Sequence, residues 1–305
     1  MGSDVQERCN QRPSKLIRLV SRWISWYLRA SPIAKGKHAI WKIGARHLFV
    51  AEMHRGLCVR TSGLTDGEKA LFLKGSKEPR SLAFATEFLE PGMVAFDVGA
   101  NIGYFTLTFA SCVGKSGQVH AFEPTPALAD RIRLNAALNC LTQIRVNQVA
   151  IAESSGIATL HLSREDPEAN SLYPIETGTP TVSVSRVALD TYVTDAGVNR
   201  LDLIKIDCEG SELNVLRGAT RILTGPNAPV ILVECNPASL SACGGTVSEL
   251  CAQFRSVSYD CYCLEEFRMG NHPVWNLLAV NSSHLKALRL LREFGLEQFR
   301  AYEEG

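Results

Sequence analysis

The sequence predicts an α/β fold with a mostly parallel seven-stranded sheet, one antiparallel strand and helices on both faces. From residue 91 onward, apolar runs alternate with helical patterns, an order typical of parallel sheets. The runs "VAFDV", "DLIKI" and "VILVE" are continuously apolar, as expected of strands covered on both sides. The last two strands are joined by residues 267–273, a loop too short for a parallel crossover, so one strand must run antiparallel.

The order of elements follows from the same patterns. We expect an amphipathic helical arm over residues 1–36, a small lead-in over 37–90 with short strands and a helical stretch at 64–90, and the main domain over 91–305. The main domain should contain strand 93–99, helix 103–112, strand 117–124, helix 126–139, strand 144–152, an inserted hairpin of 157–162 and 181–187, helix 188–196, strand 201–207, helix 211–218, strand 228–235, helix 246–255, strands 259–266 and 274–280, and a C-terminal helix.

Composition excludes several classes of protein. Hydrophobic residues make up 46% and charged residues 21%, which is ordinary for a globular protein with a full core. The net charge of +1 gives no argument for a nucleic-acid partner. Ten scattered cysteines in a chain this long indicate reduced thiols rather than a disulfide framework. Cys261 and Cys263 have no second pair at zinc spacing, so no metal site is predicted.

The segment "SKLIRLVSRWISWYLRASP" predicts an amphipathic helix within residues 14–30. Its arginines are too frequent for a membrane span, and no signal-peptide cleavage site follows. Two interpretations stay open: packing on its own domain or a partner chain, and contact with a membrane surface. We expect a cytoplasmic protein, peripheral on the inner face of a membrane under the second interpretation. The apolar side comprises Leu16, Leu19, Val20, Trp23, Ile24, Tyr27 and Leu28, and the other side comprises Arg18, Arg22, Ser25 and Arg29.

The stretch "VAFDVGANIGYF" is the first motif that indicates a ligand. Asp97, Gly99, Asn101 and Gly103 follow a strand at the sheet edge where open α/β folds bind ligands, and glycines let backbone approach closely. Glu123 closes the next strand, where an acid accepts hydrogen bonds from two ribose hydroxyls. Asn101 stands where a dinucleotide fingerprint has glycine, which disfavours a nicotinamide cofactor. The anionic Asp97 suits a cofactor with an ammonium and a sulfonium better than one with phosphates.

These motifs resemble the Rossmann-like S-adenosylmethionine-dependent methyltransferases, and more closely the FkbM family. "FDVGANIGYFTL", "VHAFEPTP", "VSRVALD", "LDLIKIDCEGSELNVLRGA" and "VILVECNP" stand in the family's order between residues 82 and 280. The resemblance implies S-adenosyl-L-methionine as cofactor. It places Asp97, Gly99, Asn101 and Gly103 around the methionine part, Glu123 on the ribose, and Val149 and Ala150 near the adenine.

A second group of polar residues follows the two central strands. Methyl transfer to a hydroxyl needs a base, and Asp207 or Glu209 could serve if burial raises its pKa. His272, in the last loop, is a further candidate base. Glu212 is better explained as a first-turn helix acid. Oxygen ligands here would suit magnesium, but no metal is predicted.

Substrate contacts are expected beside these acids. Lys205 shares the strand face of Asp207, and Glu234 and Asn236 end the neighbouring strand. The long polar loop 164–180 is a candidate lid. In it, Asn170 and Ser171 match a short polar motif of the family's inserted hairpin.

The sequence therefore predicts a methyltransferase acting on a hydroxyl of a sugar, glycolipid or secondary metabolite. The partner would be a small molecule or a glycan-type acceptor, not a nucleic acid. Nothing in the residues excludes an amine acceptor. A nicotinamide-dependent oxidoreductase and a non-catalytic protein that retains the cofactor fold are the alternatives.

Overall fold

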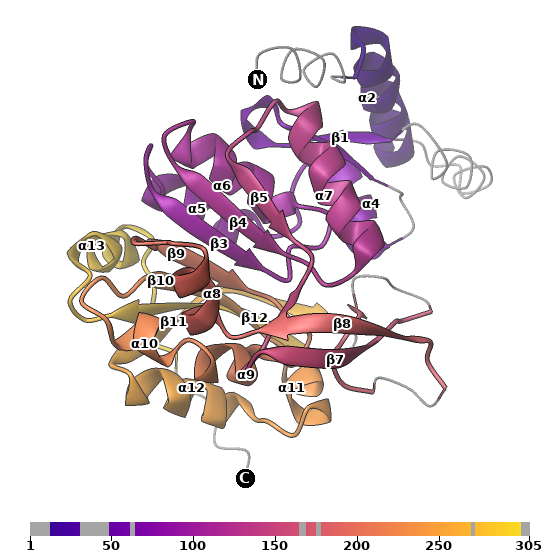
Figure 1. The fold of residues 1–305 in the computed structure, drawn as a ribbon. Coiled ribbons are helices and arrows are strands. Elements are labelled where there is room, and N and C mark those ends of the chain that lie inside the picture. The colour runs from indigo at the N-terminus through magenta and orange to yellow at the C-terminus, as the bar shows by residue number, and fades with distance from the viewer. Residues whose placement is uncertain are drawn as a thin grey trace.

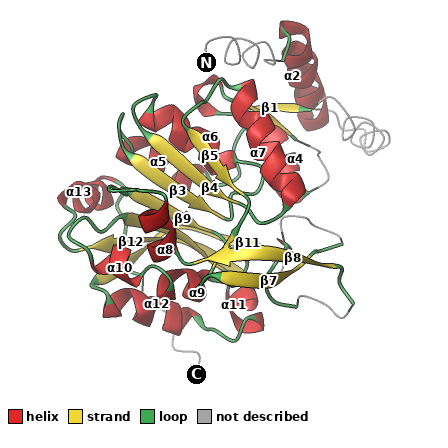
Figure 2. Ribbon diagram, in the orientation of Figure 1, coloured by secondary structure: helices red, strands yellow, loops and turns green. Residues whose placement is uncertain are grey.

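A seven-stranded sheet forms the centre of the molecule in the computed structural model, which describes residues 13–30, 49–61, 65–164, 169–174, 178–269 and 272–299 (Figures 1 and 2). The strand order is β11-β12-β10-β9-β3-β4-β5, and every neighbouring pair is parallel except those that include β12. This confirms the predicted sheet. Its strands are β3 Val94–Val98, β4 Gln118–Phe122, β5 Ile144–Asn147, β9 Leu203–Ile206, β10 Val230–Cys235, β11 Tyr259–Met269 and β12 His272–Asn281.

Helices cover both faces of the sheet, and successive strand residues alternate between two apolar clusters. Ala95, Leu203 and Val230 belong to one cluster, while the following residues Phe96, Ile204 and Ile231 belong to the other. One face is covered by α5 Pro79–Phe88, α6 Tyr104–Val113, α7 Pro126–Leu138 and α13 Leu285–Glu293. The other is covered by α8 Leu189–Asp195, α9 Glu212–Arg217, α10 Thr220–Thr224, α11 Pro237–Ala242 and α12 Val247–Ser256.

The short helices α10 and α11 were not predicted, and the final hairpin differs from expectation. The strands β11 and β12 extend through most of the expected loop 267–273, and His272 is the first residue of β12. The antiparallel direction of β12 is confirmed. Among the described cysteines no disulfide forms.

The predicted strand 144–152 is wrong as a single element. The chain turns after β5, where the amide of Val149 donates to the carbonyl of Asn147. Ala150–Ile151 then forms β6, which pairs with β8 Thr181–Val187 in a separate sheet of order β6-β8-β7. The inserted hairpin of β7 Gly156–His161 and β8 is confirmed, and it extends away from the main sheet (Figure 1).

The lead-in segment is docked on the main domain by amide side chains. It contains β1 Val50–Glu52, the short helix η1 His54–Gly56, β2 Cys58–Arg60 and α4 Asp66–Lys74. Asn135 of α7 accepts from the amide of Arg60, and Asn139, which follows the end of α7, accepts from the amide of Cys58. The expected helical stretch 64–90 is two helices, because Gly75 ends α4 with a φ of 74° and Pro79 begins α5. The strand expected within 38–48 lies outside the described residues.

The predicted N-terminal helix is present as α2 Lys15–Ala30, but it packs through an unexpected face. Its serines make the contacts: Ser21 accepts from the amide of Val50, and Ser25 donates to the carbonyl of Phe72. Of the residues expected on the packed side, Leu28 is buried, whereas Leu16 is 70% exposed. Within the described part of the chain, no helix has the length and apolar character needed to cross a bilayer.

Candidate active site

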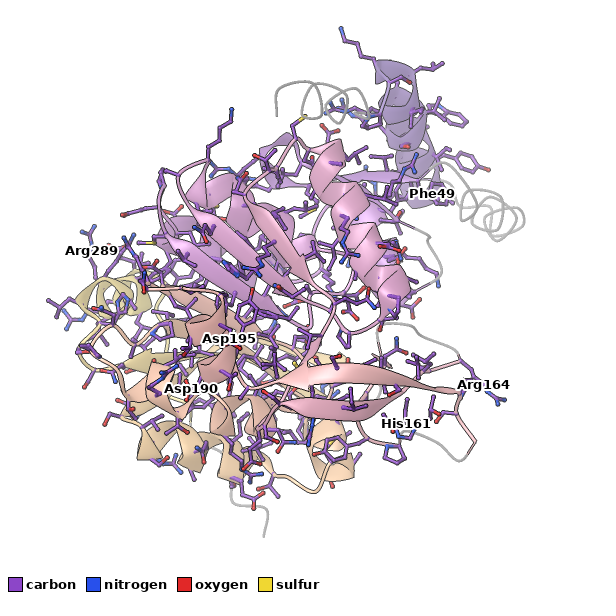
Figure 3. The ribbon with its side chains drawn as sticks, viewed as in Figure 1. Phe49, His161, Arg164, Asp190, Asp195 and Arg289 are labelled. Carbon is purple, nitrogen blue, oxygen red and sulfur yellow. The ribbon has the colours of Figure 1, made fainter. Side chains whose placement is uncertain are left out.

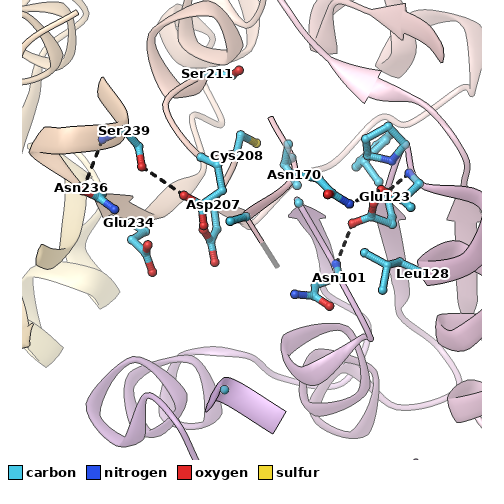
Figure 4. Close-up of a pocket in the computed structure, with 18 of the residues that line it drawn as sticks. Asn101, Glu123, Leu128, Asn170, Asp207, Cys208, Ser211, Glu234, Asn236 and Ser239 are labelled. Carbon is cyan, nitrogen blue, oxygen red and sulfur yellow. Dashed lines mark hydrogen bonds between the residues drawn. The ribbon is translucent and has the colours of Figure 1, made fainter. Parts of the chain in front are cut away.

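A cavity of about 760 Å³ opens at the carboxyl ends of the parallel strands (Figure 4). Its size lies within the range of about 300–1,000 Å³ found for small-molecule and cofactor sites. The turns after five neighbouring strands of the main sheet contribute to its wall, as expected for an open α/β sheet. Of the predicted site residues, those that line it are Gly99, Asn101, Glu123, Ala150, Asn170, Asp207, Glu209, Glu234 and Asn236.

Glu123 is buried at one end of the cavity and held by two backbone amides. Its Oε2 accepts from the amide of Asn101 at 2.9 Å, and its Oε1 accepts from the amide of Thr125 at 2.9 Å. Burial raises the pKa of Glu123 to about 7, although both amide hydrogen bonds oppose the shift. The carboxylate is therefore fixed in orientation while it still borders the cavity.

The turn between β3 and α6 carries an unsatisfied acceptor. Asn101 has a φ of 51°, a left-handed conformation that asparagine tolerates. Its side-chain Oδ1 is buried and has no hydrogen-bond partner among the described residues, and the same is true of Ser211 Oγ. Both residues line the cavity. Buried polar atoms without partners are rare in proteins, so this pair fits a polar ligand.

Asp97 and Gly103 lie behind this turn rather than on the main cavity wall. Asp97 is 1% exposed, accepts a hydrogen bond from Thr106 Oγ1, and lines a small adjoining cavity of about 20 Å³. Burial raises its pKa. Gly103 caps α6 with a φ of 92°, and a Cβ there would contact Ile132 of α7 at 3.4 Å. It lines neither cavity.

Carboxylates gather at the other end of the main cavity. Glu78, Asp207 and Glu234 each place one oxygen within 4.8 Å of the others. Lys205 lies beside them, with its Nζ 2.8 Å from Asp207 Oδ2 and 4.6 Å from the centre of the Phe105 ring. Burial opposes the ionised form of Asp207, but the Lys205 ammonium outweighs this effect, so the pKa of that carboxyl is lowered. Oxygen ligands of this kind suit a hard cation, yet the Lys205 ammonium already supplies positive charge here.

Glu209 stands next to this group with the properties of a proton acceptor. It is held in a left-handed conformation with a φ of 48°, and its Oε2 accepts from Ser239 Oγ at 3.1 Å. Burial raises the pKa of Glu209 to about 8, with further contributions from Asp207 and Glu212. Burial also raises the pKa of Glu234 well above its ordinary value. The neighbouring acids Asp207, Glu209 and Glu234 thus differ in proton affinity.

Glu212 has a structural environment. It is 3% exposed, does not line the cavity, and its Oε1 accepts from the amides of Cys208 and Gly210. These bonds hold the turn that carries Glu209. Burial raises the pKa of Glu212 to about 7.

The candidate lid contributes one described piece to the site. Ala169, Asn170 and Leu172 line the cavity, while residues 165–168 and 175–177 lie outside the described residues. Asn170 donates to Thr125 Oγ1 and accepts from the amide of Ser163, and Ser171 Oγ donates to the carbonyl of Glu209. In the view of Figure 4, Asn170 lies between Glu123 and the Asp207 end of the site. The segment is therefore tied to both ends of the cavity.

The remaining predicted residues have distinct positions. Lys205 is buried beneath Asp207 and lines the small cavity, not the large one. Asn236 lines the large cavity and caps α11 by accepting from the amides of Ala238 and Ser239. The side chain of His272 is not among the side chains that the structure describes.

Glu78 is the main residue that sequence reasoning missed. It comes from the lead-in, immediately before α5, and accepts from Asn276 Nδ2 of β12 at 3.0 Å. Burial raises its pKa. The neighbouring Lys77, along with Asp66 and Gly67 of α4, also lines the cavity. Only the tertiary packing of α4 and α5 brings this segment to the sheet edge, so no local pattern could have identified it.

A comparison with known families shows which family the chain belongs to. Residues 97–261, more than half of the chain, match the model of the FkbM methyltransferase domain. The chain belongs to the FkbM methyltransferase family. The cofactor of this chain is accordingly S-adenosylmethionine, and the buried carboxylate of Glu123 and the unpaired acceptor of Asn101 fit it. Glu78 and α2 lie outside the matched residues.

Individual relatives each match a little under half of the chain. It is 35% identical over 161 residues to 31-O-demethyl-FK506 methyltransferase FkbM of Streptomyces tacrolimicus, covering 43% of this chain and 60% of the relative. It is 30% identical over 150 residues to the 2-O-methyltransferase NoeI of Sinorhizobium fredii, covering 44% and 60%. It is 30% identical over 148 residues to the hexuronic acid methyltransferase AglP of Haloferax volcanii, covering 48% and 59%. The chain thus spans about 60% of the length of these relatives.

Solved structures show weaker similarity. A precorrin-6y C5,15-methyltransferase from Geobacter metallireducens matches with a TM-score of 0.43 and 13% identity, covering 68% of this chain and 89% of that one.

The buried acids predict how stability depends on pH. Glu212 keeps its proton up to about pH 7 in the folded state, whereas its ordinary pKa is 4.5. The unfolded chain therefore loses this proton first, and the contribution to the free energy of unfolding falls as pH rises from about 4.5 to about 7. The shift corresponds to about 3 kcal/mol. Glu212→Gln mimics the protonated acid. Between pH 5 and pH 8, its free energy of unfolding in urea should fall by about 2–3 kcal/mol less than that of wild type.

Wild type and Glu212→Gln share all other buried groups, so the difference between their pH curves reports on Glu212 alone. These shared groups include His120, whose pKa burial lowers to about 4. The exposed variant Glu153→Gln is the control and should follow wild type. Parallel pH curves for wild type and Glu212→Gln would contradict this account of the turn.

Proposed function

We propose that this chain transfers a methyl group from S-adenosylmethionine to a hydroxyl of a sugar, glycolipid or secondary metabolite. One observation carries the proposal: a single cavity has the fixed carboxylate of Glu123 at one end and Glu209, with a pKa near neutrality, at the other. In this proposal, a ribose-binding group and a general base would border the same ligand-sized cavity. The names of two relatives support an oxygen acceptor, because both specify O-methyl chemistry.

The cofactor would be held by the turns after β3, β4 and β5. Glu123 would accept hydrogen bonds from the ribose hydroxyls, and Asn101 Oδ1 would accept one from a cofactor donor. Val149 and Ala150 would border the adenine. When bound, S-adenosylmethionine supplies an electrophilic methyl group on a sulfonium centre. Asp97, one layer behind, would support the turn and contribute negative charge near the methionine part.

Glu209 is the best-suited base among the three acids. A general base is most effective when its pKa lies near the working pH. Asp207 is held ionised by Lys205 and is correspondingly a weaker base, and burial raises the pKa of Glu234 well above its ordinary value, so that Glu234 favours the protonated form. Glu209 would accept the proton of the acceptor hydroxyl at Oε1 or Oε2, while Ser239 fixes the orientation of its carboxylate.

The acceptor would be held by the acidic end of the cavity. Glu78, Asp207 and Glu234 offer carboxyl oxygens, and Asn236 offers an amide, which together suit several hydroxyl groups. The hexuronic acid named for one relative is an acceptor of this polyhydroxyl kind. Asn170 and its segment would close over the ligand, which helps to exclude water during displacement.

The catalytic unit we propose includes the lead-in. Cavity-lining side chains from α4 and from the residues before α5 support a boundary earlier than residue 91. The amide contacts from α7 to β2 support the same conclusion, since they dock this segment on the main domain. The arm of residues 1–36 would not belong to this catalytic unit.

Cofactor binding is tested by calorimetric titration with S-adenosylhomocysteine and, separately, NADH. We expect only the first to bind. Glu123→Gln should weaken its affinity about 10- to 100-fold, because hydrogen bonds to charged groups contribute about 1.5–3 kcal/mol. The exposed Glu153→Gln is the matched control and should leave affinity unchanged. Binding of NADH, or an unchanged Glu123→Gln, would overturn the proposed cofactor site.

The base is tested by methyl transfer from labelled S-adenosylmethionine to a hexuronic acid and a panel of other sugars. The rate should rise with pH and level off above about 8, because Glu209 must be ionised to accept a proton. Glu209→Gln should reduce turnover about 10²- to 10⁴-fold while S-adenosylhomocysteine still binds. The exposed control Glu249→Gln should be unaffected. If His272→Ala abolishes turnover and Glu209→Gln does not, the base is His272.

A further inference from the structure

Most of the exposed large apolar side chains of the described residues lie on the outer face of α2. Of the eight large apolar side chains that are exposed in the described part of the chain, five lie on this one helix. Contiguous apolar patches on a protein surface mark sites of contact with another molecule. The five side chains, which we call the α2 apolar face, are Leu16 at 70% exposure, Leu19 at 61%, Val20 at 39%, Trp23 at 62% and Trp26 at 58%.

The spacing puts these side chains on one side of the helix. Residues three and four apart are neighbours on a helix surface, and the five positions follow that spacing. Tyr27 extends the face, with its ring stacked on that of Trp23 at 5.9 Å. The opposite side is already used, since Ser21, Ser25 and Leu28 are buried against the lead-in. Figure 1 shows α2 at the periphery of the molecule.

The charges beside this face indicate what covers it. The helix contains Lys15, Arg18, Arg22 and Arg29 and no acidic residue. Arg18 is paired with Glu52 at 2.8 Å, and Arg22 lies 3.8 Å from the same carboxylate, yet the Arg22 side chain remains 71% exposed. Lys15 and Arg29 are exposed as well. At 100° per residue these three lie together along one border of the α2 apolar face. The surface therefore combines Leu and Trp side chains with an adjoining row of cations.

We propose that α2 docks the protein on an anionic lipid bilayer surface. Helices that lie in the membrane interface bury an apolar face of Leu and Trp beneath the headgroups and place Lys and Arg against anionic lipids. Trp side chains favour this interfacial depth. A second copy of the chain fits less well, because a symmetric contact through the same face would bring the two rows of cations together. The docking does not depend on the proposed methyl transfer.

Vesicle flotation of the full-length protein tests the proposal. The protein should float with phosphatidylcholine vesicles that contain phosphatidylglycerol, and much less with pure phosphatidylcholine. Leu16→Gln/Leu19→Gln should abolish flotation. The matched control Leu134→Gln/Leu285→Gln removes two leucines that are 48% and 80% exposed on other helices and should float like wild type.

The contribution of charge is tested in the same assay. Arg22→Gln/Arg29→Gln should weaken binding to the anionic vesicles by roughly tenfold or more, since each basic residue near such a surface contributes about 1 kcal/mol, or about fivefold in affinity. The control Arg255→Gln/Arg289→Gln changes two exposed arginines elsewhere and should have no effect. Figure 3 labels Arg289 at the edge of the molecule away from α2.

Each contrary result overturns the proposal. Failure of wild type to float with anionic vesicles would do so, as would equal losses in the α2 variants and their controls. A dimer in solution that dissociates in Leu16→Gln/Leu19→Gln, without flotation of wild type, would show that a second copy covers the face. Unchanged S-adenosylhomocysteine binding in the α2 variants would show that they fold, so that lost flotation reports on docking alone.

Discussion

The close approach of Gly99 to the backbone of Asp207 is the constraint on which the site depends. Gly99 has a φ of 79°, and a Cβ at this position would lie 1.7 Å from the carbonyl oxygen of Asp207. Only glycine allows the turn after β3 to lie directly against the turn after β9. The amides of Gly99 and Ala100 both donate to the carbonyl of Phe122, which ties the same turn to the end of β4. Three strand ends are thus drawn together, and the acids that follow them border one cavity.

The cost of this convergence is the burial of many carboxyl groups. Burying charge is unfavourable unless it is paired or hydrogen-bonded. The structure offsets it in three ways: Lys205 pairs with Asp207, backbone amides bind Glu123 and Glu212, and burial leaves Glu209 and Glu234 with raised pKa values. A spread of proton affinities within one cavity is what acid–base chemistry requires. In the function we propose, the burial that raises the pKa of Glu209 also suits it to accept a proton.

Local patterns in the sequence predicted most of the main domain and half of the site. Continuous apolar strands, the "DVGANIG" turn and the acids at strand ends each have a local signature, so the sheet and the positions of Glu123, Asp207 and Glu209 could be predicted. Glu78 could not, because its place depends on how α4 and α5 pack against β12. The break at Val149 depends on pairing with β8, a distant strand. On α2 the apolar pattern predicted the helix but not its packing, because the buried face includes Ser21, which accepts from Val50, and Ser25, which donates to Phe72.

The crystal structure of the protein with S-adenosylhomocysteine would test the account most directly. We propose that the ligand lies in one cavity with its ribose at Glu123 and its sulfur toward Glu209. We expect both ribose hydroxyls within hydrogen-bond distance of the Glu123 carboxylate, the adenine beside Val149 and Ala150, and the sulfur directed toward the end that contains Glu209. A ligand with its ribose away from Glu123, or with its sulfur turned from Glu209, would contradict it.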